Sequence, residues 1–221
     1  MRPNASHWCP VTPHMTPARV ILLTGPSGSG KSSLAARTGL PVLNLDDFYK
    51  EGNDPTLPLL VEGELGSGTD WDSPRSWDHL TAVGAIAELC RTSRTSVPVY
   101  DIATSSRTGE AMFDIGRTPL FIAEGIFAAH IIEYCRDMGV LADALCLRGR
   151  PSTTFRRRLL RDLREGRKSV PYLIRRGLRL MRAERGIVAD QTALGAYACG
   201  KETAMGRIAA AAAGRREGVR V

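Results

Sequence analysis

The sequence predicts an α/β fold in which helices cover both faces of a parallel five-stranded sheet. Short apolar runs typical of buried strands alternate along the chain with segments of helical periodicity. The 221 residues, of which 43% are hydrophobic, suffice for one sizeable α/β domain and at most a small second one. No apolar run approaches the roughly 18–20 residues that cross a bilayer, so we expect no membrane partner.

Five apolar runs predict the strands. They cover residues 18–24, 41–45, 96–100, 119–125 and 142–149. A long loop over residues 51–70 follows the second run, and a hairpin around Thr108-Gly109 follows the third. We expect one domain over residues 18–212, between a disordered leader, 1–17, and a frayed tail, 213–221.

Helical patterns fill the segments between the predicted strands. A short helix begins at Lys31 and ends at Gly39, and another covers residues 126–138. Ser73 as N-cap and Pro74 at the first helical position predict the start of an amphipathic helix.

The last third of the chain is helical in pattern and rich in arginine. Helical periodicity runs over residues 152–212, with breaks expected near Pro171 and Gly186. The formal net charge is +7, and eleven arginines lie within residues 156–185. Such a cluster suits phosphate groups, either on a nucleotide or on nucleic acid.

The cysteines indicate a reducing compartment. The chain has five, and none belongs to a C-x-x-C pair. This number and spacing disfavour a disulfide framework and a structural zinc site. We therefore expect a cytoplasmic location.

The stretch "GPSGSGKS" (25–32) matches the phosphate-binding pattern G-x-x-x-x-G-K-[ST] and lies between a predicted strand and a predicted helix. Its glycines let successive backbone N–H groups point at phosphate oxygens, Lys31 reaches the β- and γ-phosphates, and Ser32 offers a hydroxyl to Mg²⁺. The predicted ATP-binding residues are Gly25, Pro26, Ser27, Gly28, Ser29, Gly30, Lys31, Ser32 and Ser33.

A phosphate-binding loop alone is compatible with switch GTPases, ATP-driven motors and small-molecule kinases. The D-x-x-G and N-K-x-D patterns of a GTPase do not occur in the sequence, and the run "PLFIAEG" ends in the single acid Glu124. If the strands that precede Glu124 and the loop are neighbours, this carboxylate lies beside the loop and can hold a Mg²⁺-bound water.

Two adjacent acids, Asp46 and Asp47, follow the second predicted strand in "NLDDFYK". Because ligands gather at the carboxyl ends of parallel strands, one of the two is well placed to accept a proton from an acceptor hydroxyl. The alternative is a turn-forming pair with no catalytic role. These features favour a small-molecule kinase.

Several stretches together resemble the uridine–cytidine kinases and their relatives, phosphoribulokinase and the bacterial-type pantothenate kinases. They are "GPSGSGKSS", "DDFYK", "DWDSPRSWD", "VPVYD", "AEGIF" and "RRRLLRDLREGRK", in the family's order from about residue 20 to residue 168. The resemblance implies a P-loop NTPase fold, ATP and Mg²⁺ as cofactors, and an Arg-rich helical lid over about 151–168.

The resemblance also implies roles for individual residues. Asp46 becomes the catalytic base, Asp72 binds sugar hydroxyls, Tyr100 contacts a nucleobase and Glu124 lies near the metal with Ser32. Tyr49, from the D-x-F-Y element, joins the substrate-binding residues.

The lid and the hairpin supply the remaining roles. Arg158 and Arg161 of the lid close on the phosphates, where Arg161 and Lys31 bear the charge of the transferring phosphoryl group. The uridine–cytidine kinases have a base-reading His after Tyr-Asp, followed two positions later by Arg. This sequence has Ser105 at the His position and retains Arg107, which we assign to acceptor binding.

Other arginines and two tryptophans have simpler interpretations. Arg156, Arg157 and the arginines from Arg175 to Arg185 are expected on a solvated helix face. Trp71 and Trp77 flank Asp72 and either stack on a planar base or anchor the following helix.

The sequence as a whole predicts ATP-dependent phosphorylation of a nucleoside hydroxyl, as in the uridine kinases. Ser105 leaves open a kinase for another small metabolite, pantothenate-like or sugar-phosphate-like. A non-catalytic nucleotide-binding regulator is a further alternative. Nucleic acid is disfavoured as a partner because Tyr172 is the one aromatic residue within 156–185, and a homo-oligomer is left open.

Overall fold

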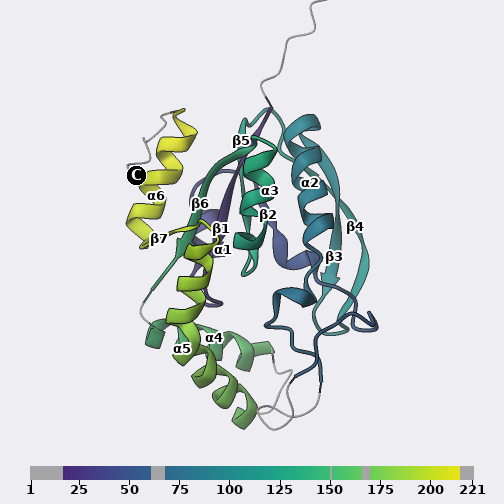
Figure 1. Ribbon diagram of the computed structural model, residues 1–221, viewed down its shortest axis with the longest axis vertical. Helices are drawn as coiled ribbons and strands as arrows, with labels where there is room; N and C mark the ends of the chain where they lie inside the picture. Colours follow the sequence, from purple (N-terminus) through teal and green to yellow (C-terminus); the bar gives the residue numbers. More distant parts are fainter. Residues whose placement is uncertain (1–16, 61–67, 150, 166–169, 215–221) are drawn as a thin grey trace, which may run out of the picture.

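The computed structural model describes residues 17–60, 68–149, 151–165 and 170–214. Its centre is a parallel sheet with strand order β2-β5-β1-β6-β7 (Figure 1). The strands are β1 (Arg19–Thr24), β2 (Val42–Asn44), β5 (Leu120–Glu124), β6 (Leu141–Leu147) and β7 (Tyr197–Cys199). The predicted α/β fold with a parallel five-stranded sheet is confirmed. Most of the predicted leader and tail, and residues 166–168 of the predicted lid, lie outside the described residues.

Helices cover both faces of the sheet and its lower end in Figure 1. Helices α2 (His79–Thr92) and α3 (Ile132–Asp137) pack on one face, and α1 (Lys31–Ala36) and α6 (Lys201–Ala212) pack on the other. Helices α4 (Pro151–Glu165) and α5 (Val170–Ala193) form a pair at the carboxyl ends of the strands. Among the described residues, no helix combines the length and apolar character of a membrane span.

The core explains why the central strands are continuous apolar runs. In β1, Val20 and Leu22 join the cluster beneath α2 and α3, whereas Ile21 and Leu23 join the cluster beneath α1 and α6. All four side chains are at most 1% exposed. A strand buried on both faces loses the polar alternation of a half-exposed strand, which is typical of parallel sheets.

One predicted strand, residues 96–100, lies outside the main sheet, and one strand of the main sheet, β7, was not predicted. Residues 96–100 fall in β3 (Arg94–Asp101), which pairs antiparallel with β4 (Ser106–Asp114) in a separate two-stranded sheet. Exposed and buried positions mix along β3, as expected for a strand with one covered face. The fifth strand of the main sheet is β7, where a helix was expected. It has three residues and an exposed Tyr197, so no apolar run indicates it.

Three predicted boundaries also differ. The hairpin turns at residues 102–105, not at Thr108-Gly109, which lie inside β4. Ser73 caps the short 3-10 turn η2 (Pro74–Ser76), whereas α2 is capped by Asp78, whose carboxylate accepts from the backbone N–H of Thr81. Helix α5 begins one residue before Pro171, near the first predicted break, and continues through the second, at Gly186. Its proline is tolerated because it lies in the first turn, where the missing N–H has no helical partner.

The glycine that follows β5 controls how closely two neighbouring segments approach. A Cβ at Gly125 would lie 2.8 Å from the Cβ of Leu45 and 3.1 Å from Oδ1 of Asp46. Both belong to η1 (Leu45–Phe48), the 3-10 turn after β2. The turn that bears the two acids therefore packs directly against the end of β5.

We expect Gly125→Ala to lower the free energy of unfolding by about 1–3 kcal/mol, because the added methyl group must push η1 away from β5. The control is Gly84→Ala, where a Cβ would meet nothing within 4 Å. Since Gly84 is exposed within α2, that change should add up to about 1 kcal/mol of stability. Urea unfolding of both variants measures the difference, and an unchanged midpoint for Gly125→Ala would contradict the tight packing.

Candidate active site

The phosphate-binding loop has the backbone that its glycines predict. Gly25, Gly28 and Gly30 have φ angles of 138°, 85° and 96°, in the region that favours glycine. A Cβ at Gly28 would lie 2.7 Å from the carbonyl oxygen of Thr154, so α4 packs directly on the loop. Lys31 is 6% exposed, and its ammonium donates to the carbonyl oxygens of Gly25, at 2.9 Å, and Pro26, at 3.4 Å. The loop is thus folded around its lysine.

A cavity at the carboxyl ends of β1, β2 and β5 joins residues from distant parts of the chain. Its lining consists of Ser27, Gly28, Gly30, Lys31, Ser32, Ser33, Asp46, Glu124, Ile126 and Arg157. Eight of these ten residues are predicted site residues, drawn from the loop, from η1 and from the end of β5. Of the other loop residues, Ser29 is 3% exposed, and its hydroxyl has no hydrogen-bond partner among the described residues.

Sheet register brings Glu124 to the loop. Parallel pairing sets Glu124 level with Leu23 of β1 on one side and with Asn44 of β2 on the other. The prediction that Glu124 lies beside the loop required β1 and β5 to be neighbours, and this pairing is confirmed. Burial raises the pKa of Glu124 above its ordinary value of 4.5, and the Ser32 hydroxyl and the charge of Lys31 oppose that rise.

The oxygen atoms at this position suit a magnesium ion. The Ser32 hydroxyl stabilises the ionised form of the Glu124 carboxylate, and the charges of Asp46 and Asp47 act on the same group. Magnesium prefers such hard oxygen donors and takes its other ligands from water and nucleotide phosphates, not from a protein cage. The described residues contain no group of three or more His, Cys, Asp or Glu side chains able to enclose a metal. Ser32 and Glu124 are the residues that would hold the ion.

The two adjacent acids of η1 point in different directions. Asp46 lines the cavity, and its Oδ1 accepts a hydrogen bond from the backbone N–H of Ile126 at 3.3 Å. Asp47 is turned to Asn44, whose amide donates to it at 2.9 Å. The buried Trp77 fixes this turn, because its indole N–H donates to the carbonyl oxygen of Leu45 at 2.7 Å. Trp77 therefore anchors η1.

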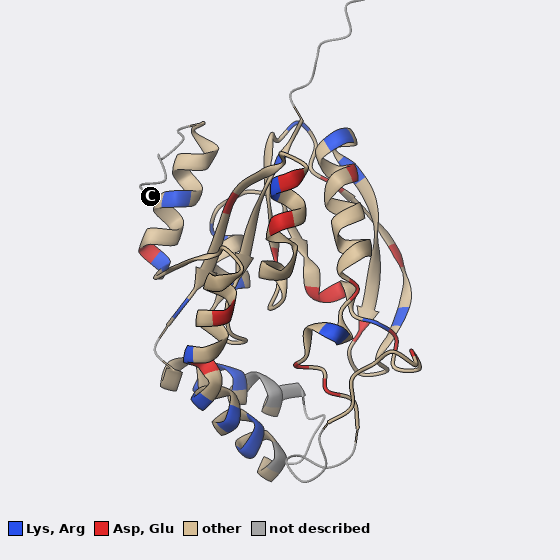
Figure 2. Ribbon diagram, in the orientation of Figure 1, with Lys and Arg blue, Asp and Glu red and all other residues tan. Residues whose placement is uncertain are grey.

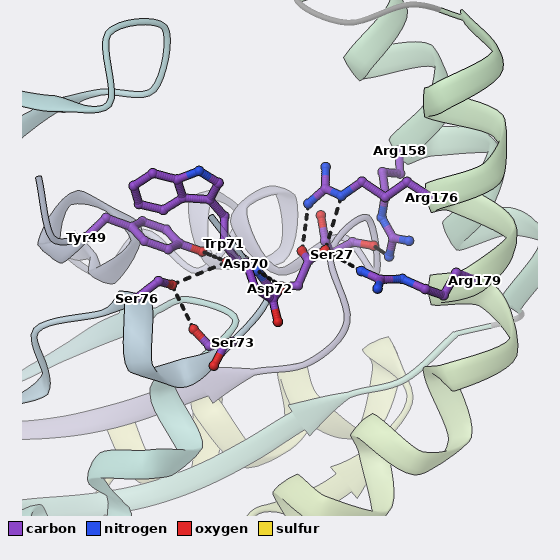
Figure 3. Close-up of polar contacts among 10 residues, drawn as sticks. All are labelled: Ser27, Tyr49, Asp70, Trp71, Asp72, Ser73, Ser76, Arg158, Arg176 and Arg179. Carbon is purple, nitrogen blue, oxygen red and sulfur yellow. Dashed lines mark hydrogen bonds and ion pairs between the residues drawn. The ribbon is translucent and has the colours of Figure 1, made fainter. Parts of the chain in front are cut away.

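The lid helix meets the loop through an arginine. The guanidinium of Arg158 donates to the carbonyl oxygen of Ser27, and the residue is 3% exposed (Figure 3). Glu184 of α5 is equally buried, accepts from the Thr154 hydroxyl at 3.4 Å and feels the charge of Arg158. Arg158 thus lies over the phosphate-binding loop, whereas the side chain of Arg161 falls outside the described part of the chain.

Two cations near the loop were not foreseen. A Cβ at Gly30 would lie 3.2 Å from Nζ of Lys201 and 3.4 Å from Nη1 of Arg157. Lys201 begins α6 directly after β7, and Arg157 comes from α4. Arg157 is exposed, as expected, but it also lines the cavity. No sequence pattern indicated Lys201, since its position depends on the unpredicted strand β7.

Asp72 is bound by two arginines of α5 (Figure 3). Arg176 donates from Nε to Oδ2 at 3.1 Å and from Nη2 to Oδ1 at 2.6 Å, and Arg179 donates from Nη2 to Oδ2 at 3.4 Å. Both side chains are about a third exposed or less. Arg175, Arg182 and Arg185 are exposed, as predicted, but the expectation of a solvated face is wrong for Arg176 and Arg179.

An aromatic cluster lies beside this ion pair. The ring of Tyr49 is 5.9 Å from that of Trp71, 5.8 Å from that of Tyr100 and 6.0 Å from that of Phe127. Burial raises the pKa of Tyr49, and the nearby charges of Asp46 and Asp72 raise it further. The charges of the predicted base and of the carboxylate that the arginines hold thus both act on Tyr49.

Arg107 and Tyr100 are paired across the hairpin. Arg107 donates to Oδ2 of Asp78 at 3.2 Å, and the Tyr100 hydroxyl donates to the carbonyl oxygen of Lys50 at 3.1 Å. Ser105 has a φ of 51° in the hairpin turn, and its side chain lowers the pKa of Tyr100, which burial raises overall. The predicted acceptor residues thus come from the hairpin, from the segment before η2 and from η1.

Comparison with known proteins agrees with this geometry. The chain is 31% identical over 157 residues to a uridine kinase of Schizosaccharomyces pombe, covering 66% of this chain and 32% of the relative, so it spans about a third of that protein. A uridine kinase of Clostridium tetani is 25% identical over 170 residues, covering 74% of this chain and 77% of the relative. A solved structure from Silicibacter sp. TM1040, assigned as a fructose transport system kinase, has a TM-score of 0.52 at 19% identity, covering 80% and 87%. No protein-family model matches the sequence.

A parallel sheet with a phosphate-binding loop after its first strand, and a helix pair packed on that loop, defines the α/β fold of the P-loop kinases. The two relatives from Schizosaccharomyces pombe and Clostridium tetani are both uridine kinases. Within this class the chain is similar to the uridine kinases.

We expect Glu124→Gln to raise the melting temperature of the nucleotide-free protein at neutral pH. The folded pKa of Glu124 lies above 4.5, so the ionised carboxylate destabilises the fold increasingly as pH rises through the range from 4.5 to that raised value. Well below pH 4.5, where the carboxyl group is protonated in both states, the two proteins should melt alike. Thermal melts across this pH range measure the difference in melting temperature between the variant and the parent protein. Glu133→Gln, a change at an exposed residue, is the control. A difference in melting temperature that does not depend on pH would contradict the raised pKa of Glu124.

Proposed function

We propose that the protein transfers the γ-phosphoryl group of ATP to a hydroxyl group of a small polar metabolite. The observation that supports this most directly is the cavity shared by Lys31, Asp46 and Glu124. It combines a phosphate-binding cation, a carboxylate within reach of an attacking hydroxyl and a carboxylate suited to a metal ion.

In the proposed reaction the acceptor hydroxyl oxygen bonds to the γ-phosphorus as the bond to the β,γ-bridging oxygen breaks, and ADP leaves. Asp46 takes the hydroxyl proton or orients the hydroxyl. Lys31 and Arg158 stabilise the negative charge of the transferring group, and Arg161 is proposed for the same role from the family resemblance. Held at Ser32 and Glu124, Mg²⁺ would neutralise phosphate charge.

Nucleosides are the first acceptors to test, because two relatives are named uridine kinases. Tyr49, Trp71 and Tyr100 offer aromatic surface beside the predicted base, which suits a planar group. The ion pair at Asp72 favours a second class of acceptor, which is argued below. A cytoplasmic location is part of the proposal, since Cys90, Cys135, Cys146 and Cys199 are free thiols.

We expect Asp46→Asn to reduce kcat by about 10²–10⁴-fold while ATP binds with unchanged affinity, because the variant loses a proton acceptor and no phosphate contact. The matched control is Asp47→Asn. Its carboxylate faces Asn44 and lies outside the cavity lining, so turnover should change little. Acceptor-dependent ADP release measures kcat, and calorimetry measures ATP binding. Full turnover in Asp46→Asn would refute the assignment, and no turnover in the parent with any acceptor would favour the non-catalytic regulator.

Lys201 is proposed as a further nucleotide contact. We expect Lys201→Met to weaken ATP binding by about ten-fold, because a charge-assisted hydrogen bond to phosphate is worth roughly 1.5–3 kcal/mol. Arg117→Met removes an equal charge from an exposed turn and serves as the control. Equal losses in the two variants would reveal a general effect of net charge and exclude a direct contact.

A further inference from the structure

The starting observation is that Asp72 is nearly saturated by arginine. A carboxylate offers about four acceptor positions. Three N–H groups of Arg176 and Arg179 already occupy Asp72, two of them on Oδ2 and one on Oδ1. While these contacts stand, Asp72 can accept about one further hydrogen bond. The two hydroxyls of a sugar diol therefore cannot both bind to it, as the family resemblance implies they should.

The arrangement on α5 is that of an anion site. Arg176 and Arg179 lie three residues apart, so they share a helix face and converge on one carboxylate (Figure 3). Arg176 engages it through two parallel N–H groups, the geometry with which guanidinium recognises carboxylate and phosphate. Arginine positions gather along α4 and α5 (Figure 2). The carboxylate of Asp72 thus occupies a fork that also fits an anion from outside the chain.

A packing contact fixes the direction of this helix face. Gly177, next to Arg176, is buried, and a Cβ there would lie 2.6 Å from Cε2 of Phe155 in α4. Glycine inside a helix costs about 1 kcal/mol relative to alanine, so its occurrence at this contact reflects the close approach of the two helices. The contact holds α5 against α4 and aims Arg176 across to Asp72.

The ion pair also lies near the proposed reaction. The charges of Asp46, Asp72 and Arg176 all act on the Tyr49 hydroxyl, which donates to the carbonyl oxygen of Trp71 at 3.3 Å. Tyr49 directly follows η1, which bears Asp46, and its hydrogen bond reaches the residue before Asp72, so one side chain connects the predicted base with the arginine fork. An acceptor that presents a hydroxyl to Asp46 brings the rest of its structure close to the arginines.

We propose that Arg176 and Arg179 recognise an anionic group, carboxylate or phosphate, on the acceptor, which takes the place of Asp72 in the fork. The exchange frees Asp72 to accept hydrogen bonds from acceptor hydroxyls. This inference rests on the proposed phosphoryl transfer and names its acceptor class. It differs from the nucleoside acceptor, which carries no such group.

The test uses acceptors matched in pairs: pantothenate with panthenol, gluconate with sorbitol, and ribulose 5-phosphate with ribulose, with uridine as a neutral reference. We expect the anionic member of at least one pair to have a kcat/KM at least ten-fold higher than its neutral partner. Which pair responds separates carboxylate from phosphate. Equal or better use of neutral acceptors, uridine included, would overturn the inference and leave the proposed kinase activity intact.

Two arginine variants test whether Arg176 causes the preference for anionic acceptors. Arg176→Gln should raise the KM of the anionic acceptor about ten-fold or more and leave that of its neutral partner within two-fold. Arg175→Gln, in the exposed neighbour on the same helix, should change neither KM. If Arg176→Gln impaired both members equally, the ion pair would be a structural tie and the inference would be wrong.

Binding separates this inference from the kinase proposal. Each probe is titrated by calorimetry into the ADP-bound protein. Asp72→Asn removes the internal competitor and should tighten binding of the anionic probe several-fold, whereas Arg176→Gln should abolish it. If no acceptor yields ADP, the kinase proposal fails, but anion binding that depends on Arg176 would still uphold the fork. Absence of such binding for every anionic probe overturns the inference.

Discussion

The parallel pairing of β1 with β5 is the constraint on which the candidate site depends. It sets Glu124 level with Leu23, one residue before β1 ends and two before the phosphate-binding loop begins. Pairing of β2 on the other side of β5 sets Asn44 at the same level, so η1 emerges there with Asp46. A slip of one residue would turn Glu124 to the opposite face of the sheet. The register thus fixes the relative positions of these acids and the loop.

The helix pair α4–α5 connects the two sides of the site. Helix α4 contacts the phosphate-binding loop through Arg158, and α5 contacts the segment before η2 through Arg176. The close approach of Gly177 to Phe155 packs one helix on the other. A change in the contacts of Arg176 therefore acts on a helix that is packed against the one covering the loop. The coupling needs only direct packing, because the two contacts belong to adjacent helices.

The parts that the sequence predicted are those encoded locally. The loop at residues 25–32 and the apolar runs of the central strands depend on residue types within short windows, and the structure contains the loop and these strands. The strand β7 and the ion pair at Asp72 were missed because both depend on partners that are distant in the sequence. Strand β7 pairs with β6, and Asp72 pairs with Arg176, which is 104 residues away. Arg176 and Arg185 look alike in sequence, and only the packing of α5 makes one half-buried and the other exposed.

The distribution of buried charge gives an argument for the site that does not depend on any motif. Lys31 and Glu124 are 6% exposed, and Arg158 and Glu184 are 3% exposed. Burying an ion costs several kcal/mol unless partners compensate, so a fold selected for stability alone would avoid four such groups at one edge. Lys31 and Arg158 are held by loop carbonyl oxygens, which are weaker partners for a cation than an anionic phosphate. The charges of Glu124 and Glu184 act on these cations from within the protein, and a bound polyphosphate, as proposed above, would add further negative charge at the same edge.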